Sequence, residues 1–205
     1  EKTNWTQSHR AWLAATAREL TGPLGLIITH HLEHLEYLES QRSALDAAIE
    51  RLAQQPPWRE GAEALCCFRG IALLTAMTLL TELGDIRRFA SPRQLMAYSG
   101  LIPGERSSGD IQRRGPITKS GNAYLRRVLV EAAWHYHHRA GADLILRRRR
   151  MGQDPGVVAV AVKAQHRLYK RFWHLRATKH KNQAVTAVAR ELCAFVWEAL
   201  SMLSK

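Results

Sequence analysis

Apolar residues recur every three or four positions along most of this chain, a spacing that predicts helices. The first is a short helix over residues 5–20, which Thr21-Gly22-Pro23 ends. A single long helix is expected from residue 122 to about 149, with Tyr124 among its inward-facing residues. Further helices are predicted over residues 58–68, 73–83, 93–99, 155–176 and 182–203. The pattern predicts a mainly α fold without a doubly wound sheet.

Residues 24–52 repeat a 4-3 spacing that is typical of a coiled coil, and hence of a homodimer or tetramer. A long helix packed within its own domain is the alternative. Two prolines, Pro56 and Pro57, then break the pattern. We therefore expect an N-terminal linker helix (1–23), a coiled-coil oligomerisation helix (24–55) and a compact helical domain (56–205). The seam positions are Leu24, Ile28, His31, Leu35, Leu38, Arg42, Leu45, Ile49 and Leu52.

A tight turn of sequence Arg-Gly-Ile-Ala joins the predicted helices 58–68 and 73–83. The arrangement resembles a helix-hairpin-helix element, in which turn amides and the second helix N-terminus hold a backbone phosphate. Gly70 and Ala72 are the candidate phosphate-binding positions, although Ala72 stands where the element usually has a second glycine. A plain pair of antiparallel helices that holds the core is the alternative.

Residues 100–118 are rich in glycine and proline and predict a loop, with room for a short hairpin. The loop carries two adjacent serines, Ser107 and Ser108. A hydroxyl group among fixed cations could attack a phosphodiester, because the cations offset the charge that develops on the phosphoryl oxygens. An ordinary Ser-Ser-Gly turn is the alternative. The surrounding cations are Arg106, Arg113, Arg114 and Lys119.

The loop leads into a helix start of sequence Thr-Lys-Ser-Gly-Asn. The amides of such a start, together with Lys119 and Asn122, could hold a phosphate, and simple helix capping is the alternative. Arg126 and Arg127 would extend the same surface.

The charge is unevenly distributed along the chain. The net charge is +12, but residues 105–181 hold 18 Lys and Arg against 5 Asp and Glu, a surplus of +13. Such asymmetry favours a polyanionic partner, with nucleic acid ranked above a membrane surface. No apolar run is long enough to cross a bilayer, and no leader is apparent, so a soluble, cytoplasmic protein is expected.

The cysteines and carboxylates predict no metal site. Cys66, Cys67 and Cys193 lack metal-ligand spacing and are expected to be core thiols in a reducing compartment. The acids do not follow the alternating pattern that would aim two of them at paired magnesium ions. We therefore expect neither metal nor cofactor in this chain.

Taken together, the ordered motifs resemble the C-terminal half of DEDD-type insertion-sequence transposases, the family of bridge-RNA-guided recombinases. The resemblance covers nearly the whole chain. It depends on the order of Lys2-Thr3-Asn4-Trp5-Thr6, Arg69-Gly70-Ile71, Thr81-Glu82-Leu83-Gly84-Asp85, Phe89, Ser91-Pro92-Arg93-Gln94-Leu95, Gly100-Leu101-Ile102-Pro103, Ser107-Ser108-Gly109, Arg114-Gly115-Pro116-Ile117-Thr118-Lys119, Gly121-Asn122 and Glu131-Ala132-Ala133-Trp134.

The resemblance implies a two-part enzyme that acts on double-stranded DNA and admits a guide RNA. It implies that Ser108, or failing that Ser107, forms a covalent phosphoserine–DNA intermediate. Acids that bind Mg²⁺ would lie in a RuvC-like N-terminal domain outside this sequence, so the chain is expected to be inert alone. A non-catalytic helix-hairpin-helix module for DNA binding and oligomerisation is the alternative.

Overall fold

The computed structural model describes residues 5–105, 114–141 and 143–203. They divide into two compact units, Glu1–Ile49 and Glu50–Lys205, which are described separately below. Helices make up most of the described residues, which confirms the predicted mainly α class.

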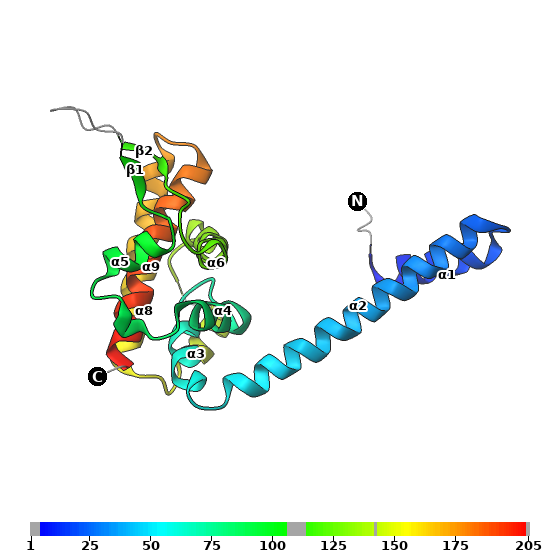
Figure 1. The fold of residues 1–205 in the computed structure, drawn as a ribbon, viewed down its shortest axis with the longest axis horizontal. Coiled ribbons are helices and arrows are strands. Elements are labelled where there is room, and N and C mark those ends of the chain that lie inside the picture. Colours follow the sequence, from blue (N-terminus) through cyan, green and yellow to red (C-terminus); the bar gives the residue numbers. More distant parts are fainter. Residues whose placement is uncertain (1–4, 106–113, 142, 204–205) are drawn as a thin grey trace. The chain divides into compact units, whose positions relative to one another are not determined.

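The first unit is a pair of helices, α1 (Gln7–Glu19) and most of α2 (Pro23–Ala53). Thr6 caps α1, since its hydroxyl accepts a hydrogen bond from the His9 amide at 3.2 Å. The helix folds back along α2 (Figure 1), where Arg10 donates two hydrogen bonds to Glu39, at 2.6 and 2.8 Å. The guanidinium group of Arg10 lowers the pKa of Glu39. This ion pair joins the two helices.

Helix α2 confirms the long helix expected from the 4-3 spacing, but much of its seam is not covered within the first unit. Leu38 and Leu45 are 50% and 63% exposed, and Leu24 is also exposed. Exposed leucines at seam spacing are typical of a coiled coil, and the coiled-coil interpretation stays a prediction.

The second unit is a helical domain built around the C-terminal helix α9 (Lys181–Leu203). This helix packs against α8 (Pro155–Arg176), α6 (Ala123–Trp134), α5 (Pro92–Tyr98) and α3 (Trp58–Cys66). Its buried side chains recur at helical spacing, so several helices share one core. Figure 1 shows α8 and α9 side by side as the long axis of this unit. The buried residues of α9 are Ala184, Val185, Val188, Ala189, Leu192, Cys193, Phe195, Val196, Ala199 and Leu200.

Helices α3 and α4 (Leu73–Leu83) form the helical hairpin expected from the sequence. Helix α3 ends two residues before the expected boundary, and Phe68 is buried in the core beyond it. The cysteines largely follow the prediction, since Cys67 and Cys193 are buried, whereas Cys66 is half-buried. Burial raises the pKa of the Cys193 thiol to about 12, which keeps it protonated and inert.

The single long helix expected from residue 122 to about 149 is wrong. Helix α6 ends at Trp134, a 3-10 turn, η2 (His135–His137), follows, and a separate helix α7 (Leu144–Arg150) begins later. His138 is extended, and Asp143 caps α7 by accepting a hydrogen bond from the Leu146 amide at 2.8 Å. A polar segment with a new cap therefore divides the helix.

The inward orientation expected for Tyr124 is also wrong, because its side chain is 63% exposed. Leu125, Val128 and Leu129 occupy the buried face of α6 instead. Tyr124 is one position off this face and points away from the core. Of the helices in the described part of the chain, none combines the length and apolar character that crossing a bilayer requires.

The turn between α3 and α4 fits only glycine at position 70. Gly70 has φ +80°, and a Cβ atom there would overlap the Ala132 carbonyl oxygen of α6. The Gly70→Ala variant is therefore expected to lower the free energy of unfolding by about 2–4 kcal/mol, from backbone strain plus displacement of α6.

Gly152→Ala is the matched control, since Gly152 has φ +76° but open space around it, and should cost only about 1 kcal/mol. Urea unfolding of both variants measures the difference. Equal losses of stability would contradict the close packing of the turn against α6.

Candidate functional site

A short antiparallel hairpin frames the segment that carries the two serines. Its strands are β1 (Pro103–Glu105) and β2 (Arg114–Ile117), with Pro103 paired to Ile117 and an irregularity in the register between the two ends of β1. This confirms the expected short hairpin. The proposed nucleophiles Ser107 and Ser108, and the cations Arg106 and Arg113, lie outside the described residues. Arg114 begins strand β2.

Backbone hydrogen bonds join the residues after β2 to the segment before β1 and to the last residue of α5. The Thr118 amide donates to the Ile102 carbonyl at 2.9 Å, and the Lys119 amide donates to the Gly100 carbonyl at 3.1 Å. The Asn122 amide donates to the Tyr98 carbonyl at 2.8 Å. These bonds satisfy backbone groups on both sides of the hairpin base. They hold the hairpin in one orientation relative to the domain.

Asn122 connects the start of α6 to α4 through its side chain. Its carbonyl oxygen Oδ1 accepts a hydrogen bond from the Leu125 amide at 2.8 Å, which caps α6. Its amide nitrogen Nδ2 donates to Glu82 Oε2 at 2.5 Å. Both ends of the side chain are therefore engaged inside the domain. This geometry favours the capping interpretation for Asn122, and phosphate binding by its side chain stays a prediction.

The segment before Asn122 has an unusual backbone. Lys119 has φ +55°, which is uncommon for a residue with a Cβ atom, and Gly121 has φ +110°. A Cβ atom at Gly121 would overlap the Tyr98 carbonyl oxygen, so only glycine fits there. Strained backbone of this kind persists where the surrounding bonds over-determine it, and it is concentrated at functional sites. Lys119 is exposed beside β2, as a phosphate-binding lysine requires.

The two arginines of α6 differ in their partners. Arg126 donates from Nη1 to the Ser99 carbonyl at 3.0 Å and so helps to hold the end of α5. Arg127 is exposed and lies 3.2 Å from Glu131 in a surface ion pair, a type that contributes little to stability. The exposed ring of Tyr124 is on the same first turn. Arg127 is thus the more accessible of the two, and phosphate contact by either stays a prediction.

The turn with Gly70 and Ala72 is bound closely to the rest of the domain. Gly70 lies against α6, and the Ile71 carbonyl accepts a hydrogen bond from Arg149 Nη1 at 3.3 Å. Ala72 is exposed and begins α4 without a side-chain cap. These contacts favour the plain helical hairpin that holds the core. The phosphate-binding role of Gly70 and Ala72 stays a prediction.

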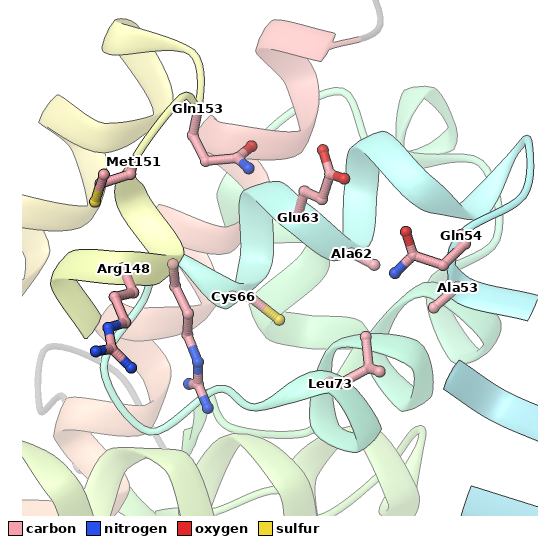
Figure 2. A pocket seen from close by; sticks show the side chains of 10 residues that line it. Ala53, Gln54, Ala62, Glu63, Cys66, Leu73, Arg148, Met151 and Gln153 are labelled. Carbon is pink, nitrogen blue, oxygen red and sulfur yellow. The ribbon is translucent and has the colours of Figure 1, made fainter. Parts of the chain in front are cut away.

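A hollow of about 270 Å³ lies between the end of α2 and helices α3, α4 and α7 (Figure 2). Ala62, Glu63 and Cys66 line it from α3, and Arg148 lines it from α7. Burial raises the pKa of the Cys66 thiol, which keeps it protonated and a poor nucleophile. The hollow offers one carboxylate and a protonated thiol, which do not make a hydrolytic site.

The run of four arginines at the end of α7 is partly structural. Arg150 donates to the Cys67 carbonyl at 2.9 Å and to Gln165 Oε1 at 2.8 Å. Arg149 binds the Ile71 carbonyl, as described above. At least two of the four side chains therefore hold the domain together. Among residues 5–105, 114–141 and 143–203, no three His, Cys, Asp or Glu side chains gather where they could bind a metal ion.

Comparison with known proteins relates this geometry to a family. Residues 62–145, which run from α3 through the hairpin and α6, match the family described as transposase IS116/IS110/IS902. Over these residues the chain is similar to that family.

Several relatives match most of the chain. "Putative transposase y4qE" of Sinorhizobium fredii is 38% identical over 96% of this chain and 47% of its own length. The transposase for insertion sequence element IS1533 of Leptospira borgpetersenii is 32% identical over 86% of this chain and 51% of its own length. The transposase for IS1328 of Yersinia enterocolitica is 34% identical over 59% of this chain and 35% of its own. The chain thus spans about half the length, or less, of these relatives.

Sequence reasoning missed Glu82 as a member of the site. Its partner Asn122 is 40 residues further along the chain, so spacing within one helix gives no signal for the pair.

The Asn122–Glu82 hydrogen bond predicts an effect of charge at position 122. Asn122→Asp keeps the capping oxygen but removes the donor and sets two carboxylates against each other. We expect it to lower the free energy of unfolding by about 2 kcal/mol at pH 7. Adding Glu82→Gln should recover most of the lost free energy of unfolding. A double-mutant cycle by urea unfolding measures this recovery.

The matched control is Asp143→Asn, the reverse exchange at the cap of α7, which should be nearly neutral because both residues cap well. If Glu82→Gln gave no recovery in the Asn122→Asp background, the coupling of α4 to α6 would be refuted.

Proposed function

We propose that this chain is the C-terminal part of a DNA transposase or recombinase. It binds double-stranded DNA and supplies a serine nucleophile, Ser108, with Ser107 as the alternative. The main support for the proposal is the β1–β2 hairpin, which is joined at its base to α5 and α6. The matched family region, residues 62–145, includes both strands and the eight residues between them.

This chain's share of the proposed chemistry is a serine hydroxyl group and the cations that surround it in the sequence. Serine Oγ forms a bond to phosphorus as the bond from phosphorus to the deoxyribose oxygen breaks, and the released sugar hydroxyl carries the proton. Because one phosphoester replaces another, the strand can be rejoined by the reverse step. Arg106, Arg113, Arg114 and Lys119 offset the charge that develops on the phosphoryl oxygens.

The metal of the reaction is proposed to be held elsewhere. The described residues bring no three potential metal ligands together. The chain spans about half the length of two of the relatives that match most of it. We infer that acids of a RuvC-like N-terminal domain, outside this sequence, bind Mg²⁺. The 205-residue chain is therefore expected to cleave no DNA by itself.

Assembly through α2 completes the proposal. The exposed seam leucines of this helix are proposed to pair with a second copy, giving a homodimer or a tetramer. A guide RNA is a second proposed polyanionic partner, since the same positive charge suits RNA and DNA backbones.

The serine assignment is tested in the complete parent protein with Mg²⁺ and its DNA. Ser108→Ala should abolish a denaturation-resistant protein–DNA adduct, because the remaining side chain has no nucleophilic oxygen. Ser107→Ala is the matched neighbour and should retain most of the adduct, measured by gel shift under denaturing conditions.

Loss of the adduct only in Ser107→Ala would move the nucleophile to Ser107. An adduct that persists in both single variants and in the double variant would contradict a serine mechanism, and would favour a non-catalytic DNA-binding module.

The assembly through α2 is tested with the 205-residue chain itself. Leu38→Glu with Leu45→Glu places four carboxylates in the seam of a dimer, so the variant should sediment as a monomer at micromolar concentration. Leu26→Glu with Tyr37→Glu is the matched control, because these residues are also exposed apolar residues of α2 but lie off the seam.

The control should sediment as the unchanged chain does. A seam variant that keeps the size of the unchanged chain, or an unchanged chain that is itself a monomer, would contradict assembly through α2.

A further inference from the structure

A second basic surface lies on the C-terminal helix pair, on residues that the proposed serine chemistry does not use. An open hollow of about 470 Å³ is formed between α8 and α9. Four basic residues of α8 and a single acid of α9 line it. They are Arg167, Lys170, Arg171, His174 and Glu191.

The basic residues recur at positions i, i+3, i+4 and i+7, which places them on one face of α8. A single carboxylate serves the two arginines. Arg167 Nε lies 3.0 Å from Glu191 Oε2, and Arg171 Nε lies 3.0 Å from Glu191 Oε1. The hollow therefore keeps an excess of positive charge.

The shared carboxylate also orients the two guanidinium groups. Arg167 donates a hydrogen bond to Glu191 through its inner nitrogen Nε, and Arg171 lies at ion-pair distance from the same carboxylate through its own Nε, so the terminal nitrogens Nη1 and Nη2 of both groups remain available to a ligand. Those terminal nitrogens form the planar fork that binds phosphate oxygens. The Glu191 side chain is only 18% exposed, whereas the Arg167 side chain is 64% exposed. The Glu191 carboxylate, which clamps the two arginines, therefore lies at the bottom of the hollow, and the terminal nitrogens of Arg167 face solvent.

We propose that this hollow binds the phosphodiester backbone of a nucleic-acid strand. The inference rests on the proposed function, which supplies the nucleic acid, and it adds a site separate from the serine hairpin. The residues extend over seven positions of α8, or about 10 Å at 1.5 Å per residue. A strand of a duplex rises about 3.4 Å per nucleotide along the helix axis, so about three nucleotide steps match this length.

The positive charge continues beyond the hollow. Arg176, Lys179 and Lys181 follow along the end of α8 and the turn into α9, and all three are exposed. In Figure 1 the turn between α8 and α9 and the β1–β2 hairpin lie toward the same end of the long α8–α9 pair. A strand in the hollow would thus leave it toward the end of the domain from which the hairpin extends.

The test uses the 205-residue chain, whose binding requires no covalent step. Fluorescence anisotropy with a 30-base-pair DNA duplex and with an RNA hairpin of similar length is measured across a series of salt concentrations. Arg167→Gln with Lys170→Gln should weaken binding about tenfold and reduce the salt slope by about 2, the loss of two phosphate contacts.

Arg51→Gln with Arg59→Gln is the matched control. It removes the same two charges from exposed positions of α2 and α3, and should change the affinity and the salt slope much less. Each arginine of the hollow can also be tested singly. Arg167→Gln alone should reduce the salt slope by about 1. Thermal unfolding of each variant verifies that the fold is retained.

A loss on the duplex, on the RNA, or on both supports the site and identifies its source of phosphate. Equal effects of the hollow variant and the control on both probes would overturn it. Neither of these binding results depends on the serine. A failure of the adduct experiment is therefore distinguishable from a failure of the hollow variants to weaken binding.

Discussion

Asn122 makes the contacts on which the candidate site depends. Its side chain caps α6 and binds Glu82 of α4, and its backbone amide binds the carbonyl at the end of α5. Three helices therefore meet at this residue, which follows the end of β2 by five positions. Each hydrogen bond is modest by itself, and the unusual backbone of Lys119 and Gly121 comes directly before the residue that makes them. A hairpin held in this way offers its connecting residues a fixed base.

The basic side chains of the chain have two roles. Arg126, Arg149 and Arg150 donate to carbonyl groups inside the domain and stabilise its packing. Other cations stay at the surface, beside the hairpin and along α8. A net charge of +12 is thus not in itself a measure of nucleic-acid contact, because part of it is structural. The cations available for nucleic-acid contact are those that face solvent and those that share a single carboxylate, such as Arg167 and Arg171.

The sequence predicted most helices because their buried residues follow the 3.6-residue period, as in α4 and α9. It missed the break after Trp134, although Gly141 and the capping Asp143 were signals of a helix end and a new start. Contacts between distant residues carry no such signal. The Asn122–Glu82 bond and the Glu191 clamp join separate helices, so neither could be read from spacing, while the basic face of α8 could have been. The predicted nucleophiles stay a prediction, since residues 106–113 lie outside the described chain.

The central claim is that a serine between β1 and β2 becomes linked to DNA. Peptide mapping of the trapped adduct by mass spectrometry tests it most directly. Trypsin cuts after Arg106 and Arg113, so residues 107–113 form one peptide that contains both serines. The account predicts that this peptide carries the nucleotide mass in the complete protein. A nucleotide attached to any other peptide, or no attachment in an active reaction, would contradict it.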